Sequence, residues 1–230
     1  KTIGSTIIML ALASSLFADN GKELKLASPD GTHEIVFYQK QVSPAVNELC
    51  YRVDYKSQPV VNESRAGLEL DNRIWEMALG VRNLKQPACW MDNLEVDSVT
   101  YQLETNLTWQ PLYGERSSVR DHYRAGTLCL SKKDNSGYRL NIEVRAYNEG
   151  VAFRYFFPEH PKAIFHKVVS DLTEYALPAG TKAWTEQWAQ AFFERLNIDD
   201  IKHPVERTLT FELPNGKWAA LADADVDDWC

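Results

Sequence analysis

Apolar and polar residues alternate with a period of two along much of this chain, and that alternation limits the fold more than any other feature. The clearest runs lie at residues 51–55, 98–103, 140–146 and 151–157. Successive side chains of a β-strand point to opposite sides, so each run presents one apolar face to a core. Many short strands of this kind predict an all-β protein built as an antiparallel sandwich or barrel.

Turn-forming residues separate the predicted strands. They lie at residues 134–137, 148–150 and 214–217. Asn-Gly between two strands is among the best hairpin signals, because both residues tolerate positive φ. We expect three hairpins at these positions, and we expect Gly150 to supply a positive φ where the chain reverses.

The N-terminus has the pattern of a secretory signal peptide. Lys1 precedes an apolar run at residues 7–13, and small residues follow as far as Ala18. The run is short for a membrane span. We therefore expect residues 1–18 to be a signal peptide and residues 19–230 to be the exported chain, with no membrane association after cleavage. The alternative is a buried N-terminal helix.

Composition and charge exclude some classes of function. The net charge is −7 with no basic cluster, which argues against a nucleic-acid partner because phosphate binding needs concentrated Lys and Arg. Aromatic residues make up 11% of the chain and include seven Trp. Such residues build β cores, and exposed ones can stack on sugar rings.

The sequence gives little evidence for helices or for a cysteine metal site. Residues 187–196 fit either a short helix or an extended loop. Cysteine spacing matches no zinc pattern. Cys50 and Cys129 lie in strand-like runs and are expected to be small buried side chains, although export would also permit a disulfide.

Four segments together resemble one known family. The sequences are LASPDG at residues 26–31, PVVNESRAGL at 59–68, WQPLYGERSSVRDHY at 109–123 and RAYNEGVAFRY at 145–155. The last two are long and specific. On these residues the chain resembles the N-terminal domain of glycoside hydrolase family 97, over nearly all of residues 19–230.

The resemblance implies an architecture. It implies an antiparallel β-super-sandwich of the galactose-mutarotase type, with few or no helices apart from the signal peptide. In the family this domain precedes a (β/α)8 barrel that carries the catalytic carboxylates. We therefore expect no catalytic residue in this chain, no activity from it alone, and a bacterial periplasmic location. The parent would be an α-glucosidase or α-galactosidase acting on α-linked oligosaccharides.

The resemblance also suggests one metal ligand, Glu194. In the family a glutamate of the N-terminal domain helps to bind calcium beside the sugar, and residues 184–196 resemble the segment that carries it. Calcium prefers hard oxygen ligands, which suits a carboxylate. The remaining ligands would come from the absent barrel. The alternative is a solvated surface glutamate, and the resemblance assigns no substrate-binding residue.

Other charged residues have structural interpretations. The acidic run Asp223, Asp225, Asp227 and Asp228 lacks the Gly and Glu of an EF-hand loop, so we expect a strand end near the domain interface. A buried ion network is expected in the 109–123 segment, from Glu115, Arg116, Arg120 and Asp121. His122 is expected to make core hydrogen bonds.

Three functions remain open from the sequence. The first is a non-catalytic domain that braces the barrel and contributes Glu194. The second is a stand-alone carbohydrate-binding module. The third is a sugar epimerase, which would need a histidine and a glutamate that converge on one sheet face.

Overall fold

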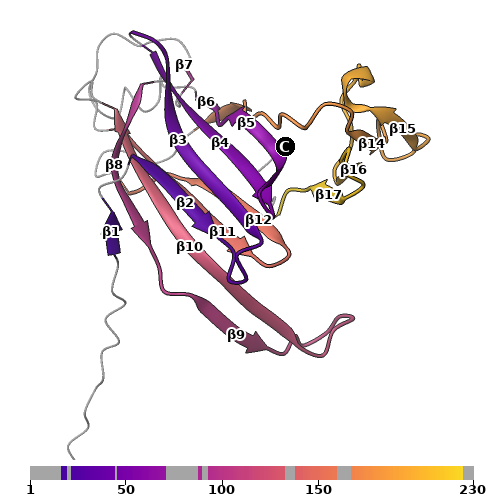
Figure 1. The fold of residues 1–230 in the computed structure, drawn as a ribbon, viewed down its shortest axis with the longest axis horizontal. Coiled ribbons are helices and arrows are strands. Elements are labelled where there is room, and N and C mark those ends of the chain that lie inside the picture. The colour runs from indigo at the N-terminus through magenta and orange to yellow at the C-terminus, as the bar shows by residue number, and fades with distance from the viewer. Residues whose placement is uncertain are drawn as a thin grey trace, which may run out of the picture.

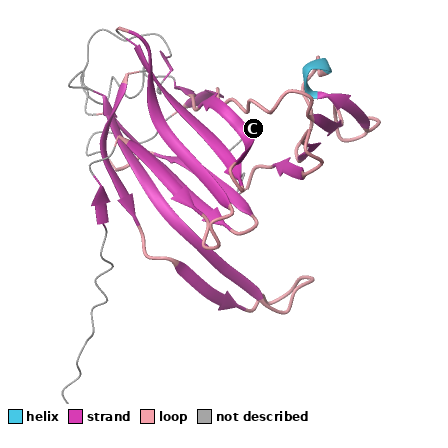
Figure 2. Ribbon diagram, viewed as in Figure 1, coloured by secondary structure: helices cyan, strands magenta, loops and turns pink. Residues whose placement is uncertain are grey.

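The protein is built almost entirely from antiparallel β-strands (Figure 2). The computed structural model describes residues 17–19, 22–44, 46–70, 88–89, 93–132, 138–159 and 167–224. The only helical element within these residues is a single 3-10 turn, η1 (Ile198–Asp200). The all-β prediction is therefore confirmed. None of the helical structure in the described ranges has the length and hydropathy of a bilayer span.

The larger sheet, sheet A, has β10 (Val119–Lys132) at its centre. The strand order is β1 (Phe17–Asp19), β8 (Leu94–Tyr101), β10, β11 (Arg139–Tyr147) and β12 (Gly150–Phe156). The N-terminal part of β10 extends past β8 and pairs with β9 (Thr105–Trp109). Figure 1 shows this pair as an arm that projects beyond the rest of the sandwich.

Sheet B packs against sheet A to complete the sandwich (Figure 1). Its strands, in order, are β2 (Glu23–Ala27), β3 (His33–Ser43), β4 (Val46–Tyr55) and β5 (Gln58–Arg65). The two sheets bury most of the alternate apolar residues of 51–55 and all of those of 140–146. Those of 151–157 are partly buried against the same core, whereas Leu103 of the 98–103 run is 58% exposed. The rings of Phe37, Tyr51 and Phe153 meet at the centre, with centroids 5.1–5.3 Å apart.

Two of the three predicted hairpins lie in described residues. Asn148 and Glu149 connect β11 to β12, with Tyr147 opposite Gly150. Gly150 does not have a positive φ, so that expectation was wrong; Gly150 begins the next strand instead. Gly216, at the other turn, has a φ of 77°. The connection at 134–137 lies outside the described residues, although the strands it joins do pair antiparallel.

Two small sheets accompany the sandwich. Sheet C consists of β13 (Val168–Asp171), β6 (Leu68–Leu70) and β7 (Ala88–Cys89). Sheet D has the order β15 (Glu194–Asn197), β14 (Lys182–Thr185), β16 (Leu209–Glu212) and β17 (Trp218–Leu221). Figure 1 shows sheet D beside the sandwich, on the side of β5 and β12.

Sheet D has its own apolar cluster. Ala183, Phe211 and Leu213 are buried at its centre. Val60 and Leu177 pack against both this cluster and the main core. These two residues therefore join the small sheet to the sandwich.

Candidate functional site

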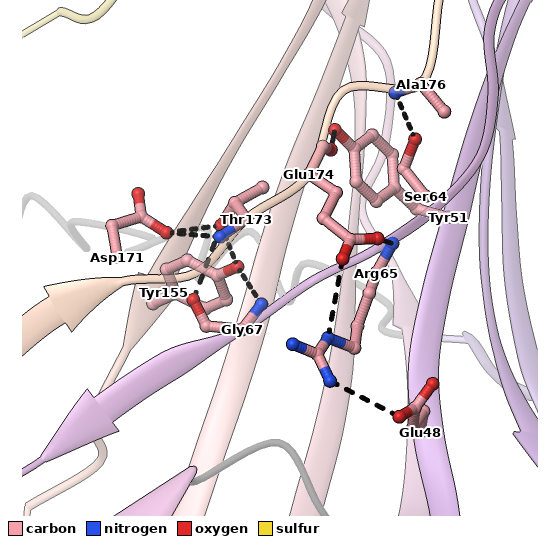
Figure 3. Close-up of polar contacts among 10 residues, drawn as sticks. All are labelled: Glu48, Tyr51, Ser64, Arg65, Gly67, Tyr155, Asp171, Thr173, Glu174 and Ala176. Carbon is pink, nitrogen blue, oxygen red and sulfur yellow. Dashed lines mark hydrogen bonds and ion pairs between the residues drawn. The ribbon is translucent and has the colours of Figure 1, made fainter. Parts of the chain in front are cut away.

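The segment that connects β13 to β14 holds sheet D in place, and we call residues 171–177 the strap. The strap runs antiparallel to β5 and bonds to it through the backbone. Asn62 N–H donates to the Ala176 carbonyl at 2.8 Å, and Glu174 N–H donates to the Arg65 carbonyl at 2.8 Å. The hydroxyl of Ser64, itself buried, accepts from the Ala176 N–H at 2.8 Å (Figure 3).

The hydroxyl groups of two tyrosines of the sandwich form hydrogen bonds with the strap (Figure 3). Tyr51 donates its hydroxyl proton to the Glu174 carbonyl at 2.6 Å. Tyr155 lies 2.6 Å from the Thr173 hydroxyl and accepts a hydrogen bond from the Gly67 N–H at 3.0 Å. Burial raises the pKa of both phenols. Both therefore stay protonated at neutral pH and keep these bonds.

Charged side chains add a further tie on the same side. Glu174 accepts from the Arg65 N–H at 3.1 Å, and its carboxylate lies 3.9 Å from Arg65 Nε. Arg65 also contacts Glu48 on β4 at 3.3 Å (Figure 3). The strap is therefore fixed by backbone, hydroxyl and ionic contacts at once, which gives sheet D a defined position relative to the sandwich.

The two faces of sheet D differ in character. Ala183 lies opposite Phe211 and Leu196, and this face carries the buried cluster. The other face carries two exposed tryptophans, Trp184 and Trp218, which are 41% and 54% exposed. Their strand neighbours on that face, Arg195 and Glu212, form an ion pair.

Glu194 is the first residue of the edge strand β15. It pairs with Thr185, so it shares the face of the buried cluster but lies at the end of that face. Its side chain is exposed and makes no hydrogen bond or ion pair within the described part of the chain. The two residues before it are strongly exposed aromatics: Phe192 at 92% and Phe193 at 68%.

The donor chemistry of Glu194 suits calcium, but this chain supplies only one ligand. Calcium takes six to eight oxygen ligands. Across the described ranges, no three His, Cys, Asp or Glu side chains lie close enough together to hold a metal ion. Glu194 is therefore one possible ligand, and a calcium site here would need its other ligands from another domain.

The projecting pair β9 and β10 has one polar face whose groups bond to one another. His122 Nε2 lies 2.7 Å from Glu104, and Arg124 donates to the same carboxylate at 3.0 Å. The hydrogen bond from His122 and the nearby Arg124 lower the pKa of Glu104. Arg120 donates to the Asn106 side chain at 2.9 Å. The expected hydrogen bonding of His122 is confirmed, but the site is at the surface.

This histidine–glutamate pair does not resemble the site of a sugar epimerase. Glu104 and His122 bond directly to each other, and Arg124 neutralises the carboxylate. A catalytic base and acid would have to face a substrate between them. The pair is better explained as a structural contact that bridges the break between β8 and β9.

One further expectation was wrong, and one open alternative is decided. No ion pair joins Glu115, Arg116, Arg120 and Asp121 in the described chain, and the first two are exposed in the loop after β9. Residues 187–191 form bends and turns before β15, so the extended alternative to a helix is confirmed. The buried ion network was wrong because β9 and β10 leave the sandwich before they reach these residues.

Asp223, the first residue of the acidic run, lies just beyond the end of a strand. β17 ends at Leu221, and Asp223 is exposed and pairs with Arg207 at 3.0 Å. The strand does not continue through Asp223, contrary to the period-two interpretation. Asp225, Asp227 and Asp228 lie outside the described residues. Cys50 is a buried free thiol, as predicted, and Cys129 is a free thiol that is only half-buried.

Sequence analysis missed two surface features. One is the pair of tryptophans on sheet D, because no motif marks them. The other is an exposed apolar face on the β9–β10 pair, formed by Leu107 and Trp109 with Val119 opposite. Alternation at residues 105–109 was the available signal, since Thr105, Leu107 and Trp109 lie on one side of the strand.

Solved structures share this fold. A glycoside hydrolase family 97 enzyme from Pseudoalteromonas sp. strain K8, in complex with acarbose, matches with a TM-score of 0.70 and 23% identity over 84% of this chain and 27% of that chain. A variant of the same enzyme in complex with panose matches with a TM-score of 0.69. A beta-arabinopyranosidase matches with a TM-score of 0.64 and 16% identity over 86% of this chain and 31% of that chain. The fold is thus one found in glycoside-cleaving enzymes.

Sequence comparison identifies the family. The family described as Glycosyl-hydrolase 97 N-terminal matches residues 26–230. A retaining alpha-galactosidase from Bacteroides thetaiotaomicron is 26% identical over 178 residues, which is 77% of this chain and 22% of that protein. The chain belongs to the N-terminal domain family of glycoside hydrolase family 97. It spans about a quarter of the length of these relatives.

Proposed function

We propose that this domain braces the catalytic barrel of a calcium-dependent α-glycosidase and contributes Glu194 to the calcium site beside the sugar. The domain itself is non-catalytic in this proposal. The parent enzyme acts on α-glucosides or α-galactosides in the bacterial periplasm. The names of the relatives support this substrate class, since one is an alpha-galactosidase and others were solved with panose or acarbose.

The position of Glu194 is the observation that carries the proposal. An exposed carboxylate without a partner in the described chain stands next to Phe192 and Phe193, which are also exposed. Exposed aromatic side chains around a single polar group are typical of a surface that another body covers. The strap joins sheet D to the sandwich, and β14, the next strand of the chain, pairs with β15, which carries Glu194.

Calcium binding by the longer enzyme tests the role of Glu194. In a family 97 polypeptide that contains this domain and the barrel, Glu194→Gln keeps the size of the side chain but removes its charge. We expect calcium affinity, measured by isothermal titration, to fall by about tenfold or more, because a carboxylate ligand is lost. Activity should recover partly when calcium is raised.

A matched variant controls for surface charge. Glu206 is exposed, and its backbone N–H donates to the Glu186 carbonyl near sheet D. Glu206→Gln should leave calcium affinity unchanged. Equal affinity in the Glu194→Gln and Glu206→Gln enzymes would show that Glu194 is not a ligand. The isolated chain should not hydrolyse aryl α-glucosides or α-galactosides above background.

A stand-alone carbohydrate-binding module is the second candidate, and the outer face of sheet D favours it. Trp184 and Trp218 lie on one face of sheet D, which also carries the Arg195–Glu212 ion pair. Aromatic faces with a few polar groups are common in ligand sites. Titration of the isolated chain with panose, followed by tryptophan fluorescence, separates the two. If the domain only braces the barrel, panose should cause no saturable change in tryptophan fluorescence. If it is a binding module, the fluorescence change should saturate, and Trp184→Ala should abolish that change.

A further inference from the structure

The projecting arm, formed by β9 (Thr105–Trp109) and the paired residues 119–123 of β10, has two chemically different faces. Each β9 residue lies opposite one β10 residue, so the two strands share faces. One face carries Leu107, Trp109 and Val119. The other carries Asn106, Thr108, Arg120 and His122. We call the first the apolar face of the arm.

Side chains of the polar face hydrogen-bond to other residues of this chain, whereas the apolar side chains are left exposed. Arg120 bonds to Asn106 at 2.9 Å, and His122 bonds to Glu104 at 2.7 Å. On the apolar face, Leu107 is 64% exposed and Trp109 is 51% exposed. The loop at the tip adds Leu112 and Tyr113, which are 100% and 90% exposed.

The apolar face continues onto the outer surface of sheet A. Leu128 and Leu130 of β10 point into the core, so the odd-numbered residues of this strand point outward. Tyr123 therefore follows Val119 and Asp121 along the outer surface, and its ring lies 5.1 Å from that of Tyr147. The Arg145 guanidinium stacks 4.6 Å from the Tyr123 ring. Sheet B lies on the opposite side and does not cover this surface (Figure 1).

We propose that the apolar face of the arm is the contact surface for the remainder of the enzyme, which packs along β9 and β10. This inference rests on the proposed function. A two-stranded ribbon is marginally stable alone, and a contiguous exposed apolar patch marks an interaction site. This chain spans 22% of the matched galactosidase and 27% of a matched structure, so most of each relative is available as the partner.

The side chains on the apolar face of the arm favour an apolar partner surface. Leu107, Trp109 and Val119 offer carbon surface, and Arg120 and His122 are turned to the other face. Asp121 is the acidic exception, and its charge interacts with Arg145. A highly charged partner would find few groups to pair with, whereas an apolar domain surface would bury these side chains without leaving a charge unpaired.

Side-chain accessibility provides the direct test. Hydroxyl-radical labelling of the isolated chain should modify Trp109 and Tyr113 readily. In a longer family 97 polypeptide that contains this domain, we expect Trp109 to lose most of its reactivity. Tyr38, which bonds to Glu63 at 2.6 Å on sheet B, serves as the reference that should not change. Unchanged reactivity of Trp109 in the longer protein would overturn the proposal.

Two neighbouring substitutions give an independent check. Leu107→Asp places a charge on the apolar face, and Thr108→Asp places the same charge on the polar face of the same strand. In the longer polypeptide, Leu107→Asp should lower Tm by several degrees more than Thr108→Asp. In the isolated chain a smaller difference should remain, because Leu107 lies opposite Asp121 whereas Thr108 lies opposite Arg120. A difference of the same size in both proteins would contradict the proposal.

The outcomes separate this proposal from that for Glu194. If Trp109 stays reactive while Glu194→Gln weakens calcium binding, the arm proposal is wrong and the calcium role stands. If Trp109 is protected in the isolated chain in a concentration-dependent way, the occupant is a second copy, and the arm proposal is again wrong. Protection that requires the longer polypeptide supports it.

Discussion

At the scale of single residues, Gly67 has the least room for a side chain among the glycines that the structure describes. It lies between β5 and β6 with its carbonyl bonded to the Leu172 N–H at 2.8 Å. A Cβ on Gly67 would lie 3.0 Å from the Leu172 Cβ. We predict that Gly67→Ala lowers the free energy of unfolding by about 1–3 kcal/mol, because the strap must move away from β5 and β6. Urea unfolding measures this.

Gly150 offers the matched control for that substitution. Nothing lies within 4 Å of a Cβ built there, and its φ is not positive. Gly150→Ala should therefore be neutral or stabilise by up to about 1 kcal/mol, because alanine restricts the unfolded chain. If both variants lose the same stability, contact with Leu172 is not the reason for the cost at Gly67.

Asp30 is a carboxylate whose pKa the fold lowers through local hydrogen bonds. Ser28 donates to its carboxylate at 2.6 Å, and the Thr32 N–H donates at 3.0 Å. These hydrogen bonds lower the pKa of Asp30 from 3.8 to about 2. A lowered pKa in the folded state stabilises the fold above the unfolded-state pKa. This contribution should be complete above about pH 4 and lost as pH falls toward 2.

Asp30→Asn tests this pH dependence. The variant should be less stable than the parent at pH 6, and the difference should shrink as the pH is lowered from 4 to 2. Urea unfolding at several pH values measures it. Glu23→Gln, at an exposed strand position with no ion pair in the described chain, should show no such trend. A difference that is constant with pH would contradict the assignment to Asp30.

At the scale of elements, the turn between β4 and β5 has an unfavourable sequence for its backbone. Lys56 and Ser57 connect Tyr55 to Gln58, and their φ angles are 49° and 59°. Two consecutive positive φ angles are typical of a type I′ turn, which favours Asn-Gly. The left-handed conformation costs ordinary residues about 1–2 kcal/mol. This hairpin forms in spite of its turn, because β4 carries buried core residues and β5 pairs with it.

Ser57→Gly should therefore stabilise the protein. Glycine relieves the strained conformation but loses more entropy on folding, so the net gain should be about 0.5–1 kcal/mol. Ser57→Ala, which keeps a Cβ at the same φ, should give no gain. Thermal unfolding of the two variants measures the difference. A larger gain from alanine than from glycine would show that the turn is not strained.

At the scale of the whole molecule, two apolar clusters are joined through few residues. Val60 and Leu177 contact both, and the strap supplies the polar ties between them. Sheet D, with Glu194 at its edge, is thus held by the sandwich while its outer face stays open. The arm of β9 and β10 extends away from the sandwich elsewhere (Figure 1). Both exposed surfaces suit a domain that works against a larger partner.

Local sequence determined many strands of the sandwich and the turn between β11 and β12. Alternation at residues 51–55 and 140–146 records which side chains face the core, since side chains of a strand point to alternate sides. The turn at Gly216 was readable because positive φ favours glycine. The family was also readable, since residues 109–123 and 145–155 carry long specific sequences.

Only the tertiary structure decided where those strands leave the core. The 109–123 segment has the charges of an ion network, but β9 and β10 carry it beyond sheet B, so Glu115 and Arg116 remain in solvent. Likewise, the strap is a set of contacts between residues more than 100 positions apart, such as Gly67 with Thr173 and Ser64 with Ala176. Period-two patterning specifies which side of a strand is apolar, but not what covers that side.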